Sequence, residues 1–77
     1  MKIIFSPHAI LKIEQRKLSR QLIIETIVRP NFNRPSYGLR EELYREFGKN
    51  YLKVVIKRES DQIIVVTAHW VASLKNK

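Results

Sequence analysis

The run of residues 63–70 constrains the fold of this chain more than any other segment. It is apolar and largely β-branched, which predicts a buried strand. Because side chains alternate along a strand, Ile63, Val65, Thr67 and His69 are expected on one face. That face therefore changes from hydrocarbon to a hydroxyl and an imidazole, and its polar end is where we expect a function to be anchored.

The length and charge of the chain limit its organisation and its partners. Its 77 residues suffice for one domain with a marginal core, so we expect a single domain over residues 1–77 with a basic tail at 71–77. Fifteen Lys and Arg against seven Asp and Glu give a net charge of +8, which favours nucleic acid as a partner and an acidic protein next. A basic protein without a polyanionic partner is the alternative, because net charge bears on association and not on fold.

Several kinds of site and segment are not expected. The chain has no cysteine, which argues against a disulfide or a thiolate metal site and fits a reducing compartment. Two histidines without carboxylates at ligand spacing indicate no metal site, and glycines at 38 and 48 alone make no phosphate-binding loop. Ser6 and Pro7 come too early for a signal peptide or a membrane span. We therefore expect a cytoplasmic protein with no cofactor, no metal and no membrane partner.

The predicted element order is strand, helix, helix, strand, strand, strand. Ser6 followed by Pro7 is typical of a helix start, and Ser19 can cap a second helix that Pro30 ends. The expected strands are 2–5, 40–47, 51–57 and 63–70, the expected helices are 7–17 and 20–28, and 31–38 is a loop of turn-forming residues. This pattern predicts an α+β domain, β-α-α-β-β-β, with two N-terminal helices packed on one face of a small, largely antiparallel sheet.

Charged and apolar pairs predict the register of the two hairpins. A turn at residues 49 and 50 pairs Phe47 with Leu52, Arg45 with Val54, Leu43 with Ile56, Glu46 with Lys53 and Glu42 with Lys57. A second turn centred on residues 60 and 61 pairs Ile56 with Val65, Val54 with Thr67 and Leu52 with His69. In this register, Arg45, Thr67 and His69 gather at one end of the face that meets the helices.

The first helix supplies a second set of polar groups. His8, Lys12 and Arg16 are spaced by four residues and therefore share one face of that helix. Imidazoles can move protons near neutral pH, and guanidiniums can stabilise a charged phosphorane-like transition state. RNA cleavage by its own 2′-hydroxyl needs only such groups and no metal. The candidate catalytic residues are His8, Arg16, Arg45, Thr67 and His69.

Each of these candidates also has a structural interpretation. His8 can be a polar surface residue, and Thr67 can be an ordinary strand residue. His69 can pack at the end of its strand, and the aliphatic stem of Arg45 can cover the core. Lys12 can be plain solvated charge. The residues alone leave both interpretations open.

The opposite face of the sheet is predicted to be largely apolar. Exposed apolar patches of this kind mark partner surfaces, and the candidate partner surface is Val55, Val66 and Trp70. The same face can instead bind single-stranded RNA through aromatic stacking and charge. The candidate nucleic-acid contacts are Tyr44 and Lys53, with Lys12 on the first helix.

Five short motifs are spread over residues 6–70. They are Ser-Pro-His-Ala at 6–9, Arg-Lys-Leu-Ser at 16–19, Tyr-Arg at 44–45, Leu-Lys-Val-Val at 52–55 and Val-Val-Thr-Ala at 65–68. Together they resemble the bacterial domain of unknown function 4258 family, in which His8, Arg16, Arg45 and Thr67 match positions expected to be typical. The arginine that this family commonly has in mid-helix appears here as Lys12 or is absent.

The element order also resembles that of the RelE and ParE toxins and the related BrnT toxins. The resemblance implies a ribonuclease toxin that an acidic or hydrophobic antitoxin segment neutralises. We therefore expect a metal-independent RNA endonuclease of a toxin–antitoxin system, with RNA or the ribosome and an antitoxin protein as partners. The alternatives are a non-enzymatic RNA- or ribosome-binding module and a protein-interaction domain that acts as a gyrase poison does.

Overall fold

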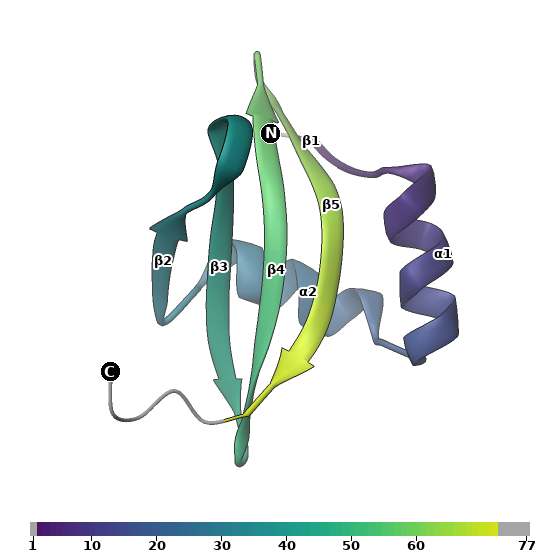
Figure 1. Ribbon diagram of the computed structural model, residues 1–77, viewed down its shortest axis with the longest axis vertical. Helices are drawn as coiled ribbons and strands as arrows, with labels where there is room; N and C mark the ends of the chain where they lie inside the picture. The colour runs from purple at the N-terminus through teal and green to yellow at the C-terminus, as the bar shows by residue number, and fades with distance from the viewer. Residues whose placement is uncertain (1, 73–77) are drawn as a thin grey trace.

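The computed structural model describes residues 2–72, which form a five-stranded sheet with two helices (Figure 1). The elements are β1 (Lys2–Phe5), α1 (Pro7–Arg16), α2 (Arg20–Val28), β2 (Phe32–Pro35), the short 3-10 helix η1 (Tyr37–Leu39), β3 (Arg40–Phe47), β4 (Asn50–Glu59) and β5 (Gln62–Val71). The strands lie in the order β1-β5-β4-β3-β2, with β1 parallel to β5 and the other neighbours antiparallel. The predicted α+β class and the order of the predicted elements are confirmed, with one further strand, β2, before the last three.

Local capping explains where both helices begin. The Ser6 hydroxyl accepts a hydrogen bond from the Ala9 N–H at 3.1 Å, and the Ser19 hydroxyl accepts one from the Leu22 N–H at 3.2 Å. α1 ends one residue before the predicted boundary, because Lys17 adopts a left-handed conformation with φ of 54°. α2 has the predicted bounds.

The prediction of an unpaired loop at 31–38 is wrong, because β2 lies within it and pairs with β3. Asn31 begins this pairing through both its backbone and its side chain. Its backbone N–H donates to the Tyr44 carbonyl at 2.7 Å, and its side-chain oxygen accepts from the Glu46 N–H at 2.8 Å. Pro35 is tolerated because β2 is an edge strand, where a missing N–H costs no ladder hydrogen bond.

The helices bury one face of the sheet, which we call the helix face; the opposite face is called the open face. α2 crosses behind the sheet in Figure 1, and α1 lies beside β5, below the end of β1. The fully buried Thr26 of α2 satisfies its hydroxyl by donating to the Leu22 carbonyl at 2.8 Å. The apolar core around it consists of Ala9, Ile13 and Leu18, Ile23 and Ile27 of α2, and Leu43, Leu52, Val54, Ile56, Ile63, Val65 and Ala68 of the sheet. Of the predicted basic tail, Val71 ends β5, and 73–77 lie outside the described residues.

The hairpin of β3 and β4 turns at Gly48 and Lys49, one residue earlier than predicted. Gly48 has φ of 67°, a conformation that favours glycine in a two-residue turn. The register shifts by two residues, so every side chain keeps its predicted face but changes its partner. Observed pairs include Arg45 with Leu52, Leu43 with Val54 and Tyr44 with Lys53, and the predicted pairs of Glu46 with Lys53 and Glu42 with Lys57 are wrong.

The hairpin of β4 and β5 contains a β-bulge that reverses the predicted faces of Thr67 and His69. Ile56 lies opposite Val65 as predicted, but Val55 lies opposite Thr67, so Val66 is an extra residue on β5. Beyond Val66, the predicted pairs Val54 with Thr67 and Leu52 with His69 are wrong; Val54 lies opposite Ala68 and Leu52 opposite Trp70. Thr67 and His69 therefore lie on the open face, and Trp70 lies on the helix face.

We predict that Ile56→Ala lowers the free energy of unfolding by about 2–5 kcal/mol, because Ile56 is fully buried and its removal leaves a cavity. The matched control is Ile64→Ala, the same truncation at a half-buried site on the open face of β5. Urea unfolding monitored by circular dichroism measures both. Equal losses for the two variants would contradict the placement of the core on the helix face.

Candidate functional site

Polar and aromatic side chains form two adjacent rows across the open face. Phe32, Tyr44, Lys53 and His69 lie opposite one another on β2, β3, β4 and β5, and Arg34, Glu42, Val55 and Thr67 form the next row. This face is turned toward the viewer in Figure 1, with α2 behind the sheet. Within the described residues, neither helix covers it.

Arg16 joins these rows from the last turn of α1. Its Nη1 donates to the Ala68 carbonyl at 2.8 Å and lies 3.5 Å from the Thr67 hydroxyl oxygen. Thr67 and His69 project from the same face of β5, and Lys53 is the cross-strand partner of His69. We call Arg16, Lys53, Thr67 and His69 the His69 cluster. The predicted association of Arg16 with Thr67 is therefore present, although on the face opposite to the predicted one.

The His69 cluster lowers the pKa of its imidazole. Burial disfavours the protonated ring, and the positive charges of Lys53 and Arg16 add to this effect, while Glu42 opposes it weakly. The ring is consequently neutral at neutral pH. A neutral imidazole can accept a hydrogen bond or a proton, and this one lies beside the positive charges of Lys53 and Arg16.

An aromatic stack adjoins the cluster and explains the burial of Tyr44. The Tyr44 ring stacks on Phe32 with centroids 4.7 Å apart, and the guanidinium of Arg34 lies 5.2 Å from the Tyr44 centroid. Only 4% of Tyr44 is exposed, so its ring is covered and supports the face rather than offering a surface to a base. Burial and the hydrogen bond from its hydroxyl to Glu42, at 2.9 Å, raise the pKa of Tyr44.

Glu42 is the one carboxylate within the two rows. Burial alone would raise the pKa of this carboxyl, but the hydrogen bond from Tyr44 and the charges of Lys53 and Arg34 outweigh burial and lower the pKa. Glu42 forms an ion pair with Lys53 at 3.7 Å. It therefore holds the ammonium group beside His69 and cancels part of the positive charge there.

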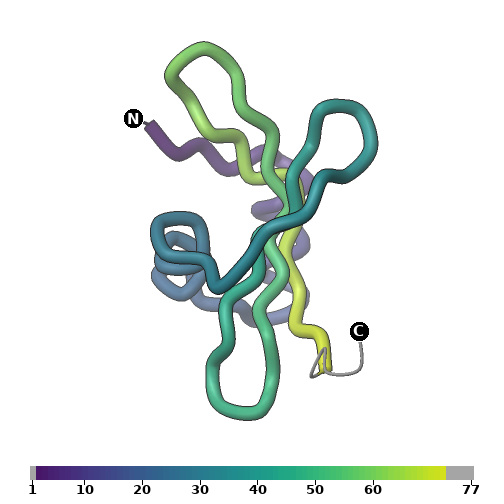
Figure 2. The backbone as a smooth tube through the Cα atoms, turned by 90° about the vertical axis from the view of Figure 1, so that its left-hand side faces the viewer, coloured from purple at the N-terminus to yellow at the C-terminus, as the bar shows by residue number. Residues whose placement is uncertain are grey.

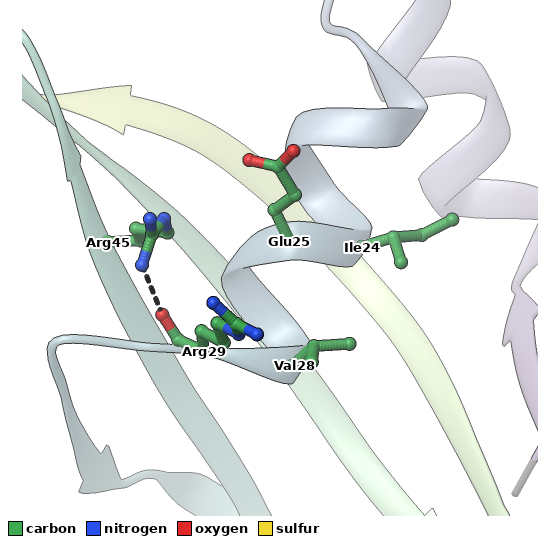
Figure 3. A pocket seen from close by; sticks show the side chains of 5 residues that line it. All are labelled: Ile24, Glu25, Val28, Arg29 and Arg45. Carbon is green, nitrogen blue, oxygen red and sulfur yellow. Dashed lines mark hydrogen bonds between the residues drawn. The ribbon is translucent and has the colours of Figure 1, made fainter.

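Arg45 lies on the helix face, away from the His69 cluster (Figure 3). Its Nη1 donates to the Arg29 carbonyl at the end of α2, at 2.7 Å, and its guanidinium is 5.5 Å from the Phe47 centroid. It lines a pocket of about 310 Å³ together with Ile24, Glu25, Val28 and Arg29. β4 and β5 separate it from Arg16, so the structure does not bring the two predicted arginines to one phosphate.

His8 and Lys12 lie on α1 without a part in the cluster. His8 is an exposed residue in the first turn, eight residues before Arg16 and hence about 12 Å from it along the helix axis. Within residues 2–72, no side-chain hydrogen bond or ion pair involves either residue. The structure thus places His69 at the opposite end of α1 from His8, and the predicted two-histidine pair is not assembled.

The predicted partner surface of Val55, Val66 and Trp70 is not one surface. Val55 lies on the open face and is only 8% exposed, whereas Val66 is the bulge residue. Trp70 lies on the helix face, 41% exposed, with its ring edge-to-face with Phe47 at 6.0 Å. The bulge separates these residues, so a single partner cannot contact all three through one sheet face.

Phe32 and Arg34 belong to the open face but are absent from the predicted site, because the sequence predicts a loop at 31–38. The available signal was their spacing by two residues, with Asn33 between them, which is the alternation of a short strand. Among the described residues, no three His, Cys, Asp or Glu side chains lie close enough to hold a metal ion. In the same part of the chain, no helix is long and apolar enough to cross a membrane.

Comparison with known proteins found no matching family model, no matching curated protein and no matching solved structure. The function of this chain is therefore inferred from the geometry and electrostatics of the open face.

We predict that Arg16→Gln raises the pKa of His69 toward its ordinary value of about 6.5, because one of the two repelling cations is removed. NMR titration of the His69 ring protons measures this, and the His8→Gln variant assigns the two histidine signals. Arg29→Gln, which removes the same charge on the helix side, is the control. An unchanged pKa in Arg16→Gln would contradict the contact between Arg16 and the cluster.

The lowered pKa of His69 also predicts a pH dependence of stability. The unfolded chain binds the proton at higher pH than the folded chain, so the free energy of unfolding falls as the pH drops below about 6.5. We expect the loss between pH 7 and pH 5 to be smaller in His69→Gln than in the wild type. Urea unfolding at each pH measures it, and equal losses would show that His69 titrates normally.

Proposed function

We propose that this protein binds single-stranded RNA across its open face. The observation that carries the proposal is the alignment of Arg34, Lys53 and Arg16 from one edge of that face to the other, with Glu42 as the one carboxylate within the two rows. Phosphate groups supply most of the affinity in such complexes, and a file of cations along a groove or sheet suits a phosphate backbone. The net charge of +8 supports the same partner.

The cations of the His69 cluster keep donors free for phosphate. The hydrogen bonds of Arg16 both come from Nη1, and a guanidinium carries five N–H donors. Its anchoring to the Ala68 carbonyl fixes the fork in place before the ligand arrives. Lys53 is held by a single ion pair with Glu42, which a phosphate oxygen can replace.

The neutral ring of His69 favours RNA over DNA in this proposal. An imidazole beside two bound phosphates can exchange a hydrogen bond with a ribose 2′-hydroxyl, which DNA lacks. Thr67 adds a hydroxyl on the same face of β5. Free RNA and ribosomal RNA both present this chemistry, and both occur in the cytoplasm, the compartment predicted from the sequence.

We predict that Lys53→Gln and Arg16→Gln each weaken binding of a fluorescein-labelled single-stranded RNA and each reduce the salt slope of log K by about 0.7. Fluorescence anisotropy over a series of salt concentrations measures both quantities. The control is Arg29→Gln, which changes the net charge equally on the helix side and should leave affinity and slope nearly unchanged. Equal effects of all three variants would indicate unspecific charge attraction instead of a defined face.

Glu42→Gln provides a prediction of opposite sign. Removing this carboxylate frees Lys53 and deletes the one negative charge in the two rows, so RNA should bind more tightly. The same substitution should lower stability, because Glu42 is ionised and bonded in the folded state. Anisotropy and urea unfolding measure the two effects, and weaker binding by the variant would contradict the proposed site.

A second candidate is a metal-independent RNA endonuclease of a toxin–antitoxin system, in which an antitoxin protein is the natural partner. Its support is the neutral imidazole between two cations, together with the resemblance to toxin families noted in the sequence. His69 would take the proton of the 2′-hydroxyl, the 2′-oxygen would attack phosphorus, the bond to the 5′-oxygen would break, and that oxygen would take a proton from water. Arg16 and Lys53 would stabilise the charge on phosphorus.

Incubation with labelled RNA distinguishes the two candidates. The endonuclease predicts a 2′,3′-cyclic phosphate product that His69→Ala abolishes while the affinity for RNA changes little. His8→Ala is the matched control and should cleave like the wild type, because His8 lies at the far end of α1. Binding without any product would leave the RNA-binding module as the function.

A further inference from the structure

The loop between β2 and β3 presents two large apolar side chains to solvent. Tyr37 is 89% exposed and Leu39 is 88% exposed, more than any other large apolar residue among residues 2–72. A hydrogen bond from the Ser36 N–H to the Arg40 carbonyl, at 2.9 Å, closes the base of the loop. The loop is thus a defined structure that directs both side chains outward.

The backbone of this loop adopts a conformation that leucine rarely takes. Gly38 and Leu39 both have left-handed geometry, with φ of 56° and 64°. Glycine adopts it freely, but the Cβ atom of leucine meets backbone atoms there. Strained residues of this kind cluster at functional sites, and Leu39 holds its apolar side chain in solvent.

The loop stands on the side of the sheet that carries the proposed RNA site. Figure 2 shows the teal β2–β3 loop projecting away from α2, which lies on the other side of the sheet. Two arginines flank it along the chain, Arg34 on the open face of β2 and Arg40 at the start of β3. The guanidinium of Arg34 lies over the Phe32 and Tyr44 rings, at 5.7 Å and 5.2 Å from their centroids.

The aromatic rings of the two rows are partly or fully covered, with Phe32 half-buried and Tyr44 only 4% exposed. Tyr44 is covered by Phe32 and Arg34, so a base on this face cannot reach its ring. Tyr37 is 89% exposed and lies three residues along the chain from Arg34 on one side and from Arg40 on the other. Every nucleobase has a π-face, and stacking on an aromatic ring adds affinity without sequence preference.

We propose that Tyr37 stacks on an unpaired base of the RNA bound to the open face, and that Leu39 packs beside that base. This inference rests on the proposed RNA-binding function and adds a stacking residue to it. The cations Arg34 and Arg40 favour a polyanion over an apolar protein segment as the occupant of the loop. The experiment must therefore distinguish RNA from a protein partner as the occupant of the loop.

The experiment compares Tyr37→Ala with Tyr37→Phe in the anisotropy assay. Loss of one stacked base is expected to weaken RNA binding roughly 5- to 100-fold in Tyr37→Ala. Tyr37→Phe should bind like the wild type, because stacking needs the ring and not the hydroxyl. With an oligomer of abasic ribose phosphates, the wild type and Tyr37→Ala should bind equally.

A fluorescent variant reports the contact directly. Tyr37→Trp combined with Trp70→Phe leaves one tryptophan in the chain, and RNA binding should quench its emission. The abasic oligomer should not, because it carries no base to stack.

The outcomes separate this inference from the function on which it rests. If Lys53→Gln weakens binding and Tyr37→Ala does not, RNA binding stands and base stacking by Tyr37 is overturned, which leaves the loop to a protein partner. If the wild type binds no RNA, both proposals are overturned. The exposed position of Tyr37 predicts unchanged thermal unfolding in all loop variants, so a lost affinity reflects a lost contact.

Discussion

β5 contributes apolar side chains to the core from both of its halves because Val66 interrupts the alternation between them. Before this residue, Val65 packs on the helices, and after it Ala68 does so. An uninterrupted strand would turn Ala68 outward and bury Thr67 and His69 against the helices. In so small a domain, two polar groups in the core would be costly, since a buried group without a partner loses its hydrogen bonds to water. The bulge thus keeps Ala68 in the core and at the same time places Thr67 and His69 on the open face.

The sequence was sufficient for the elements whose signals are local. Serine caps, prolines and apolar periods located both helices and four of the five strands. Glycine at 48 marks the turn between β3 and β4, which was predicted one residue too late. The bulge at Val66 has no such mark, because valine fits either face and no glycine or asparagine stands nearby. Its indirect signal is chemical: Thr67 and His69 are polar, whereas Ala68 and Trp70 are apolar, and only a shifted register exposes the first pair. β2 was missed for a different reason, since four residues beside prolines have little periodicity to detect.

The candidate site, like the fold, could be predicted from the sequence only in part. Arg16 and Thr67 were predicted as members of one site and do meet, because helix spacing and the end of a strand determine their positions. Arg45 was placed on the helix face, where it lies, but its partner there is the end of α2. The contacts of a long side chain depend on the three-dimensional arrangement of the backbone around it. A sequence pattern therefore predicts which face of the sheet the side chain lies on, but not which residues it contacts. The electrostatics of the open face follow from such contacts, with Glu42 joining Tyr44 and Lys53 in a single network.

The contact between Arg16 and the Ala68 carbonyl has a consequence for colloidal behaviour. β1 pairs with β5 only as far as Val65, so the second half of β5 presents an edge that another chain could extend. This strand is rich in valine and isoleucine, the composition that favours cross-β assembly. A guanidinium bonded to that edge occupies one of its acceptors and places a positive charge where a neighbouring strand would dock. The arginine proposed to bind a polyanion therefore also disfavours edge-to-edge pairing of β5 with a second copy of this basic chain.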